Sequence, residues 1–308
     1  MEAQEVTRWR GPESRFHRSL RELQETSWRL SRQIIEMTTR AGSGHPSSSL
    51  SAIDIMTALY FGGFLRYDPQ RPNLPQRDRF ILSKGHAAPA LYAVLAEAGY
   101  FEPELLSTLR TLGSPLEGHP NMRRVPGVEA STGSLGQGLS IGVGHALATR
   151  LDGYDSRVYV IIGDGESEEG QVWEAALAAA SYELDHLTAI LDHNKFQQTG
   201  PVSKIAPAMD PIAAKWRAFG WHVTESNGHN MEHILQALDG ALGVTGQPQM
   251  IIAHTKKGKG LSVFEENAEN RRHGEALSPQ EAEIALAELD ELRQAGELAI
   301  EYPKEDWE

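Results

Sequence analysis

The chain has 308 residues, of which 40% are hydrophobic and 23% are charged, so it is long enough to bury a sizeable core. Its formal net charge of −13 argues against nonspecific nucleic-acid binding, which needs a basic surface to replace counterions. The sequence has no cysteine, which excludes disulfides, thiolate zinc sites and thiol nucleophiles. It also has no apolar run long enough for a membrane span, so we expect a soluble, cytoplasmic protein.

In chain order, apolar periodicity predicts a first helix from about Leu20 to Arg40. The helix ends at a glycine-rich loop over residues 42–46, and a second helix is expected over residues 50–61. A short strand over residues 79–82 and a helix over residues 87–98 follow. The first hundred residues are therefore expected to contribute mainly helices.

The middle of the chain alternates between apolar runs and helical patterns. Residues 158–162 are continuously apolar, which is typical of a strand that is buried on both faces. A helix over residues 171–182 leads to a second apolar strand over residues 187–191. Further strands are expected over residues 221–225 and 250–254. Strand, helix and strand in repeated order predict parallel pairing with right-handed crossovers.

The expected fold is therefore α/β, a doubly wound and mostly parallel sheet with helices on both faces. No repeat or linker divides the chain, so one domain is expected over residues 1–308. It would include an N-terminal helical extension over about residues 1–40 and a C-terminal helix over about residues 278–296. Ser278 and Glu281 form the sequence pattern of a capping box at the start of that last helix.

Two polar segments stand at the predicted ends of neighbouring strands. Asp164 lies between two glycines after the first apolar strand, and Asn194 follows the second. Open parallel sheets bind ligands beyond the carboxyl ends of their strands. A carboxylate and an amide oxygen are ligands that magnesium accepts when phosphates supply the others. The Asp-Gly dipeptide alone is more typical of a turn than of a metal site, and it is the placement of Asn194 that favours a metal site.

A glycine-rich segment, Gly133-Ser134-Leu135-Gly136-Gln137-Gly138, opens a helix of small residues that continues through Ala146. Its order differs from the G-x-G-x-x-G of dinucleotide sites, and residues 128–131 before it make a poor strand. Two interpretations stay open. The glycines permit close approach of the backbone to a flat ligand, or they permit tight packing of the helix.

Four of the twelve histidines lie beside glycine or proline in predicted loops: His45, His86, His119 and His273. A single loop histidine is usually a surface residue. Four in such contexts indicate a shared role, because imidazole can bond hydroxyls and phosphates and can move protons near neutral pH.

These motifs together resemble the transketolase family, from about Leu20 to Gly274. The resemblance rests on their order and spacing: Gly42-Ser43-Gly44-His45-Pro46, Ser83-Lys84-Gly85-His86-Ala87, Gly118-His119-Pro120, Thr132 to Gly138, Gly163-Asp164-Gly165 and Asn194. It implies a thiamine-diphosphate-binding fold of the diphosphate-binding type. The implied activity is transfer of a two-carbon ketol unit from a ketose phosphate to an aldose phosphate, with thiamine diphosphate and a divalent cation such as Mg²⁺.

The resemblance implies a set of cofactor ligands. Asp164 and the side-chain oxygen of Asn194 would bind magnesium, with the backbone carbonyl of Phe196 as the third protein ligand. His86 and Gly165 would contact the diphosphate.

It also implies residues for the cofactor rings and the substrate. The backbone at Gly133 and Leu135 would face the rings of the cofactor. His45, His119 and His273 would bond sugar hydroxyls and help to move protons, and His273 would also reach the diphosphate.

Glu169 matches a glutamate that relays to the catalytic glutamate of a partner, although an ordinary acid at a helix N-terminus is an alternative. The resemblance implies a separate C-terminal subunit that carries the pyrimidine-binding and C-terminal domains, with two copies of each subunit. The catalytic glutamate and the arginines that hold the sugar phosphate would belong to that partner. The polar end of this chain, residues 302–308, is expected to be a natural terminus.

Other functions remain as alternatives. A deoxyxylulose-phosphate synthase or a 2-oxo-acid dehydrogenase component would share the magnesium motif. The pair of motifs Gly44-His45-Pro46 and Lys84-Gly85-His86 favours a transketolase over both. A noncatalytic binding or regulatory relative would have no need for the metal ligands and the four histidines together.

Overall fold

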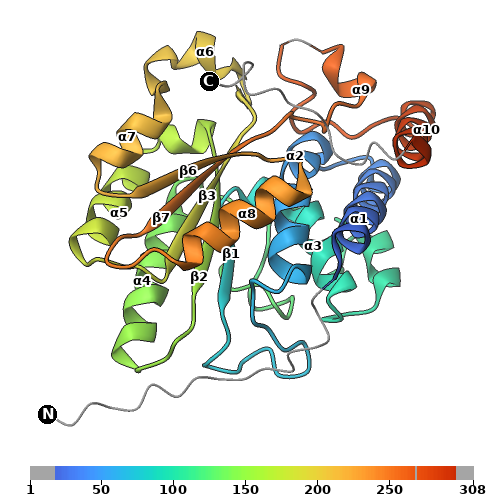
Figure 1. The fold of residues 1–308 in the computed structure, drawn as a ribbon. Helices are drawn as coiled ribbons and strands as arrows, with labels where there is room; N and C mark the ends of the chain where they lie inside the picture. Colours follow the sequence, from blue (N-terminus) through green and yellow to red (C-terminus); the bar gives the residue numbers. More distant parts are fainter. Residues whose placement is uncertain (1–17, 268, 296–308) are drawn as a thin grey trace, which may run out of the picture.

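The computed structural model describes residues 18–267 and 269–295, and its centre is a sheet of five parallel strands (Figure 1). In spatial order the strands are β1 (Arg79–Leu82), β2 (Val158–Gly163), β3 (Leu187–His193), β7 (Gln249–His254) and β6 (His222–Asn227). All neighbouring pairs in this sheet are parallel. The predicted α/β class is therefore confirmed. The first seventeen residues and the end of the chain, with the predicted terminus at 302–308, lie outside the described residues.

Helices cover both faces of the sheet, as predicted (Figure 1). One face carries α2 (Pro46–Phe61), α3 (Ala88–Glu97) and α8 (Met231–Leu242), with α1 (Leu20–Ala41) and α10 (Pro279–Ala295) packed outside them. The other face carries α4 (Gln137–Leu151), α5 (Gly170–Ser181) and α7 (Ile212–Ala218). Shorter elements complete the chain: α6 (Val202–Ile205), α9 (Ser262–Glu265) and the antiparallel pair β4 (Phe196–Gln197) and β5 (Gly200–Pro201).

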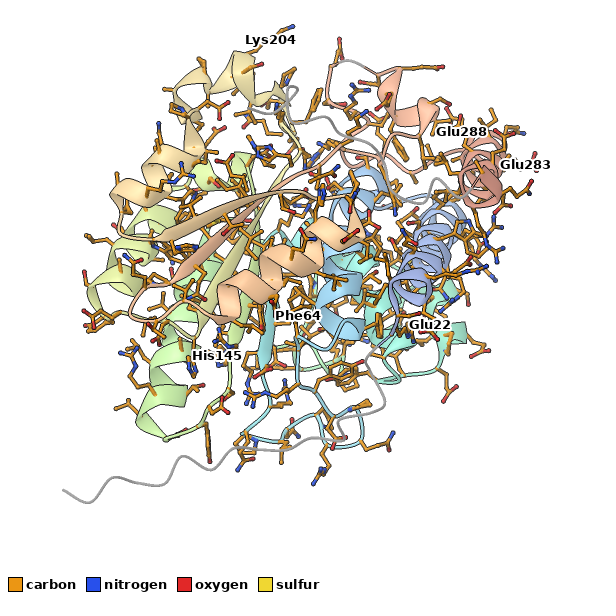
Figure 2. All side chains as sticks on the ribbon, viewed as in Figure 1. Glu22, Phe64, His145, Lys204, Glu283 and Glu288 are labelled. Carbon is orange, nitrogen blue, oxygen red and sulfur yellow. The ribbon has the colours of Figure 1, made fainter. Side chains whose placement is uncertain are left out.

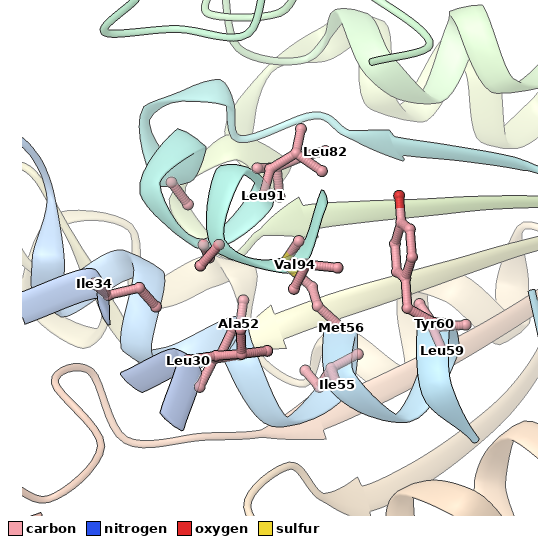
Figure 3. Packing of buried hydrophobic residues seen from close by; sticks show 14 of the residues in the cluster. Leu30, Ile34, Ala52, Ile55, Met56, Leu59, Tyr60, Leu82, Leu91 and Val94 are labelled. Atoms are coloured by element: carbon pink, nitrogen blue, oxygen red, sulfur yellow. The ribbon is translucent and has the colours of Figure 1, made fainter. Parts of the chain in front are cut away.

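The apolar strands are buried because each face of the sheet contributes to its own hydrophobic cluster. In β2, Tyr159 and Ile161 pack into the cluster of α1, α2 and α3, while Val160 packs into the cluster of α4 and α5. Figure 3 shows the first cluster, where Leu82 of β1 lies near Leu91 of α3. Full burial of each such side chain stabilises the fold by about 1.5–3 kcal/mol. Because the central strands are buried on both faces, polar and apolar residues do not alternate along them.

Helix α2 begins four residues earlier than predicted. The expected helix started at Leu50, but the structure starts it at Pro46. Proline is suited to the first helical position because its φ is already helical and its missing N–H is not needed there. Every residue of α2 is buried, and His45 is placed directly before its first turn.

The last helix begins at the predicted capping box. The Ser278 backbone N–H donates to Glu281 Oε2 at 2.8 Å, and the Glu281 backbone N–H donates to Ser278 Oγ at 3.3 Å. Along the outer side of α10, Glu283 projects away from the core, as does Lys204 of α6 (Figure 2). Over the described part of the chain, no helix has both the length and the apolarity that a bilayer crossing requires.

A buried polar network ties the first two helices to the loop after β7. The Lys259 ammonium lies 2.8 Å from Asp54 Oδ1, and the His229 imidazole Nδ1 lies 2.8 Å from Asp54 Oδ2. Burial alone would raise the pKa of Asp54, but Lys259 and His229 outweigh it and lower the pKa to about 2. The Asp54 carboxylate is therefore ionised in the folded protein at every physiological pH.

We expect Asp54→Asn to destabilise the chain at pH 7 by roughly 2 kcal/mol, because the buried Lys259 loses its counterion. A carboxyl whose folded pKa lies below its unfolded value stabilises the fold above the unfolded pKa, and this stabilisation is lost as the pH falls. The deficit of the variant should thus be complete above about pH 4 and shrink toward pH 2. Urea unfolding across this range measures it, and a deficit independent of pH would contradict the assignment.

Candidate functional site

A cavity of about 380 Å³ opens at the carboxyl ends of β1, β2 and β3. It collects ten of the eleven predicted site residues: His45, His86, His119, Gly133, Leu135, Asp164, Gly165, Asn194, Phe196 and His273. The remaining one, Glu169, does not line it. Residues from separate loops thus meet where a parallel sheet is expected to bind its ligand.

Asp164 follows β2 directly, and its carboxylate is buried at the floor of this cavity. Its Oδ1 accepts a hydrogen bond from the Gly165 backbone N–H at 2.8 Å, and its Oδ2 accepts one from the Lys195 backbone N–H. Burial raises the pKa of Asp164 to about 7, with a further contribution from the charge of nearby Asp192. A cation bound here would stabilise the ionised form of Asp164 and so offset both the burial and the repulsion from Asp192.

Asn194 lies at the end of the neighbouring strand with its amide oriented by Asp192. The Asn194 Nδ2 group donates to Asp192 Oδ2 at 3.3 Å, while Asn194 Oδ1 accepts from the Phe196 backbone N–H at 3.1 Å. The paired register of β2 and β3 sets Gly163 beside Asp192, so the two strand ends present Asp164 and Asn194 to the same cavity.

The donor set suits a magnesium ion that also has phosphate ligands. Among residues 18–267 and 269–295, no group of three or more histidine, cysteine, aspartate or glutamate side chains could hold a metal ion. Asp164 and Asn194 instead offer one carboxylate and one amide oxygen, which magnesium accepts when phosphate oxygens and water complete its octahedron. The residues therefore fit a metal–diphosphate pair and not a metal held by protein alone.

Three imidazoles form one cluster at the wall of the cavity. The ring centroids of His45, His86 and His273 lie 5.0–5.2 Å apart. Burial lowers the pKa of His45 to about 4 and that of His273 to about 3, and it lowers the pKa of His86 well below its usual value. At neutral pH all three rings are therefore neutral, and each can donate one hydrogen bond and accept another.

His119 lies across the glycine-rich loop from this cluster. A Cβ placed on Gly133 would come within 3.0 Å of the His119 ring, and a Cβ on Gly85 would lie 2.7 Å from the Gly133 backbone nitrogen. Side chains at either glycine would push the loops apart. The glycines therefore allow the loop over residues 132–136 to pack against both the segment after β1 and His119, and they keep its backbone at the cavity surface.

Two lysines near the cavity were not predicted. The Lys84 ammonium forms a buried ion pair with Asp192 and donates to the Ser48 carbonyl at 2.9 Å. The Lys257 ammonium lies 2.7 Å from His273 Nδ1, and burial lowers its pKa to about 7. Lys84 belongs to the same sequence motif as His86, so its position in that motif could have identified it as a residue near the cavity. Lys257 follows β7 by three residues, but the path of the loop that brings it to His273 cannot be predicted from the sequence.

A family model described as "Transketolase, thiamine diphosphate binding domain" matches residues 29–290. The chain belongs to the transketolase family. It corresponds to the thiamine diphosphate-binding part, and the predicted family and transferase type are thereby confirmed.

The similar proteins fall into two groups, subunits and full-length transketolases. The chain is 47% identical to the 6-deoxy-6-sulfo-D-fructose transketolase subunit SqwG of Clostridium sp. (strain MSTE9), over 83% of this chain and 92% of that one. It is 41% identical to an apulose-4-phosphate transketolase subunit of Phocaeicola vulgatus, over 84% of this chain and 91% of that one. The human transketolase is 42% identical over 93% of this chain, but only 45% of its own length is matched.

Solved transketolase structures share the fold. The transketolase of Campylobacter jejuni superposes with a TM-score of 0.81 at 31% identity, covering 94% of this chain and 45% of that chain. The present chain therefore spans slightly less than half of the full-length transketolases and nearly all of the two subunits.

At the candidate site, two neighbouring glutamates have different surroundings. Glu166 is buried and accepts hydrogen bonds from the backbone N–H groups of Gly136 at 2.9 Å and Gly163 at 3.0 Å. Glu169 is exposed at the N-cap of α5, beside Gly136. Glu166 thus holds the glycine-rich loop against β2. Glu169 remains accessible from outside, where a partner would have to reach it.

Proposed function

We propose that this chain is the cofactor-binding subunit of a two-subunit transketolase, which transfers two-carbon ketol units between sugars together with a separate C-terminal subunit. The observation that carries the proposal is the cavity at the strand ends, which combines the oxygen ligands of Asp164 and Asn194 with neutral imidazoles. The subunit names of two relatives that match along most of their length support the need for a partner. Two copies of each subunit are proposed, since closed symmetric assemblies are the norm.

In this proposal Asp164, Asn194 and the backbone carbonyl of Phe196 hold a magnesium ion, and the ion binds the diphosphate of the cofactor. His86 donates to a diphosphate oxygen, as does the backbone N–H of Gly165. The ammonium groups of Lys84 and Lys257 lie close enough to the cavity to offset the negative charge of the phosphates. The metal is needed because the chain already carries a net charge of −13.

When bound, thiamine diphosphate supplies the nucleophilic carbon with which the carbon–carbon bond is cleaved and formed. The residues of this chain orient it and exclude water. The backbone at Gly133 and Leu135 faces the cofactor rings, while His45, His119 and His273 bond the sugar hydroxyls. Because the rings of His45 and His273 are neutral at pH 7, as their low pKa values require, they can pass protons between hydroxyl groups without a change in the net charge of the site.

Glu169 is proposed to contact the catalytic glutamate of the partner. Its exposed position beside the glycine-rich loop is compatible with that role. The sugars are proposed to be anionic, since one relative is named for a sulfo-fructose and another for apulose 4-phosphate. A noncatalytic binding module would not require imidazoles, metal ligands and cations around one cavity.

Two histidine variants test the proposed function. His86→Ala should weaken the binding of thiamine diphosphate by roughly tenfold, because a donor to the diphosphate is lost. His119→Ala should leave that affinity within about twofold and lower kcat/KM by roughly tenfold to a thousandfold, as expected for loss of a group that contacts only the substrate. Calorimetry and ketol-transfer kinetics of the two-subunit complex with magnesium give both values. Equal loss of cofactor affinity in the two variants would contradict this division of roles.

A further inference from the structure

Arg110 joins the two loops that carry His45 and His119. Its Nη1 group donates to Ser43 Oγ at 2.8 Å, two residues before His45. Its Nη2 group lies 3.5 Å from the carbonyl oxygen of Gly118, the residue before His119. A guanidinium group therefore lies between the loops of the two histidines proposed to contact the substrate.

The backbone and its surroundings fix this arginine in place. Arg110 has a φ of +56°, a left-handed conformation that costs a non-glycine residue of order 1 kcal/mol. Its backbone N–H donates to the Leu116 carbonyl at 2.8 Å, which closes the loop between them. A Cβ on Gly118 would lie 2.8–3.0 Å from three atoms of the guanidinium, so only glycine lets the group lie flat against the loop.

The positive charge of Arg110 is not neutralised by the described part of the chain. Across residues 18–267 and 269–295, its guanidinium contacts Ser43 and Gly118 but forms no ion pair with a carboxylate. Burial is the largest cause of the lowered pKa of both His45 and His119, and the positive charge of Arg110 is the second. The electrostatic field of Arg110 therefore reaches both rings. Most of its five N–H donors remain available to a ligand.

We propose that Arg110 binds the anionic end of the sugar substrate, a terminal phosphate or sulfonate, and so makes this chain select charged sugars. This inference rests on the proposed function. The planar guanidinium fork matches two oxygens of a phosphate or sulfonate. Arg110 does not itself line the cavity, but the two loops that it joins carry His45 and His119, which do, so the charged end of a sugar held at these rings would lie within reach of the exposed guanidinium. This chain would thus supply its own cation in addition to any arginines of the partner.

The test compares acceptors that differ only in their charged group. The two-subunit complex is assayed with D-glyceraldehyde 3-phosphate, with the three-carbon aldehyde that bears a sulfonate at C3, and with neutral D-glyceraldehyde. Arg110→Gln removes the charge and keeps a polar side chain, whereas Arg110→Lys keeps the charge and loses the fork. Arg124→Gln is the matched control, because Arg124 is a nearby arginine whose guanidinium already pairs with Glu117.

For Arg110→Gln we expect KM for one or both anionic acceptors to rise about tenfold to a hundredfold, while kcat/KM for glyceraldehyde stays within about twofold. The anionic acceptor with the larger increase identifies the preferred group. Arg110→Lys should fall between wild type and Arg110→Gln, and Arg124→Gln should match wild type. An equal loss with glyceraldehyde, or no loss with either anion, would overturn the proposal.

A second measurement does not depend on turnover. Phenylglyoxal modifies accessible guanidinium groups, and peptide mass spectrometry quantifies its adduct at Arg110. The phosphate or the sulfonate acceptor should slow this modification severalfold in the intact complex, and glyceraldehyde should not. Absence of protection by either anion would refute the role of Arg110. A wild-type complex that transfers no ketol unit to any acceptor would refute the proposed function instead.

Discussion

Asp164→Asn should lower the affinity for thiamine diphosphate by at least about a hundredfold in the presence of magnesium, because the carboxylate that we propose as a metal ligand is lost. The variant should fold with a stability close to that of wild type. Burial raises the pKa of Asp164 to about 7, so ionisation of this carboxyl disfavours the folded state above the unfolded pKa of about 4, and a neutral amide removes that penalty. The amide also loses one acceptor, because its NH2 group faces one of the two backbone N–H groups, of Gly165 and Lys195, that donate to the carboxylate. Calorimetry with and without magnesium on the two-subunit complex measures the affinity.

Glu168→Gln is the control for this experiment. Glu168 also lines the cavity and the substitution removes one negative charge, but its side chain is exposed and is not a proposed ligand. It should leave cofactor affinity unchanged or raise it slightly. Cofactor binding by Asp164→Asn at wild-type strength, or wild-type binding that is indifferent to magnesium, would show that the metal assignment is wrong.

Gly138→Ala should destabilise the chain by about 2–4 kcal/mol, one of the largest effects expected for a single methyl group. An added Cβ at Gly138 would lie 2.4 Å from Ser83 Cβ and 2.8 Å from Ser83 Cα. Neither atom can move without shifting the end of β1. The variant would also displace the Gly138 N–H from Ser83 Oγ, to which it donates at 3.0 Å. Urea denaturation of the purified chain gives the free energy of unfolding.

Gly144→Ala, further along α4, separates packing from helix propensity. No atom lies within 4 Å of a Cβ at Gly144, so the substitution meets open space. Alanine is about 1 kcal/mol more favourable than glycine inside a helix. Gly144→Ala should therefore be neutral or stabilising in the isolated chain. If Gly138→Ala and Gly144→Ala destabilise the chain similarly, the effect at Gly138 does not come from its contact with Ser83.

Most of the fold could be predicted because its central strands are apolar throughout. The run at residues 158–162 and the run at residues 187–191 are buried between two layers of helices, and such strands have a distinctive pattern. The start of α2 was predicted four residues late, because its first turn, Pro46-Ser47-Ser48-Ser49, is poor in apolar residues although it is fully buried. Periodicity cannot detect a turn that is buried by its neighbours on every side.

The candidate site could be predicted where residues follow strands, and less well elsewhere. Asp164 and Asn194 meet because parallel strands end at one edge of the sheet, a rule that needs only the order of the elements. Lys257 and Arg110 were not predicted. Lys257 stands three residues beyond β7, and its proximity to His273 depends on a loop path that sequence does not specify. Arg110 does not line the cavity, and only its contacts with Ser43 and Gly118 connect it to the loops of His45 and His119.

If this chain is one half of an enzyme, as we propose, ketol-transfer activity must depend on both subunits, and an assay of the separate and mixed subunits measures that dependence. The purified chain is assayed with magnesium, thiamine diphosphate, a ketose phosphate and an aldose phosphate, first by itself and then after addition of the proposed pyrimidine-binding partner. We expect no transfer by either protein in isolation and transfer that rises with added partner until the two are equimolar. Activity of this chain without a partner, or none with the partner present, would contradict its proposed role as a subunit.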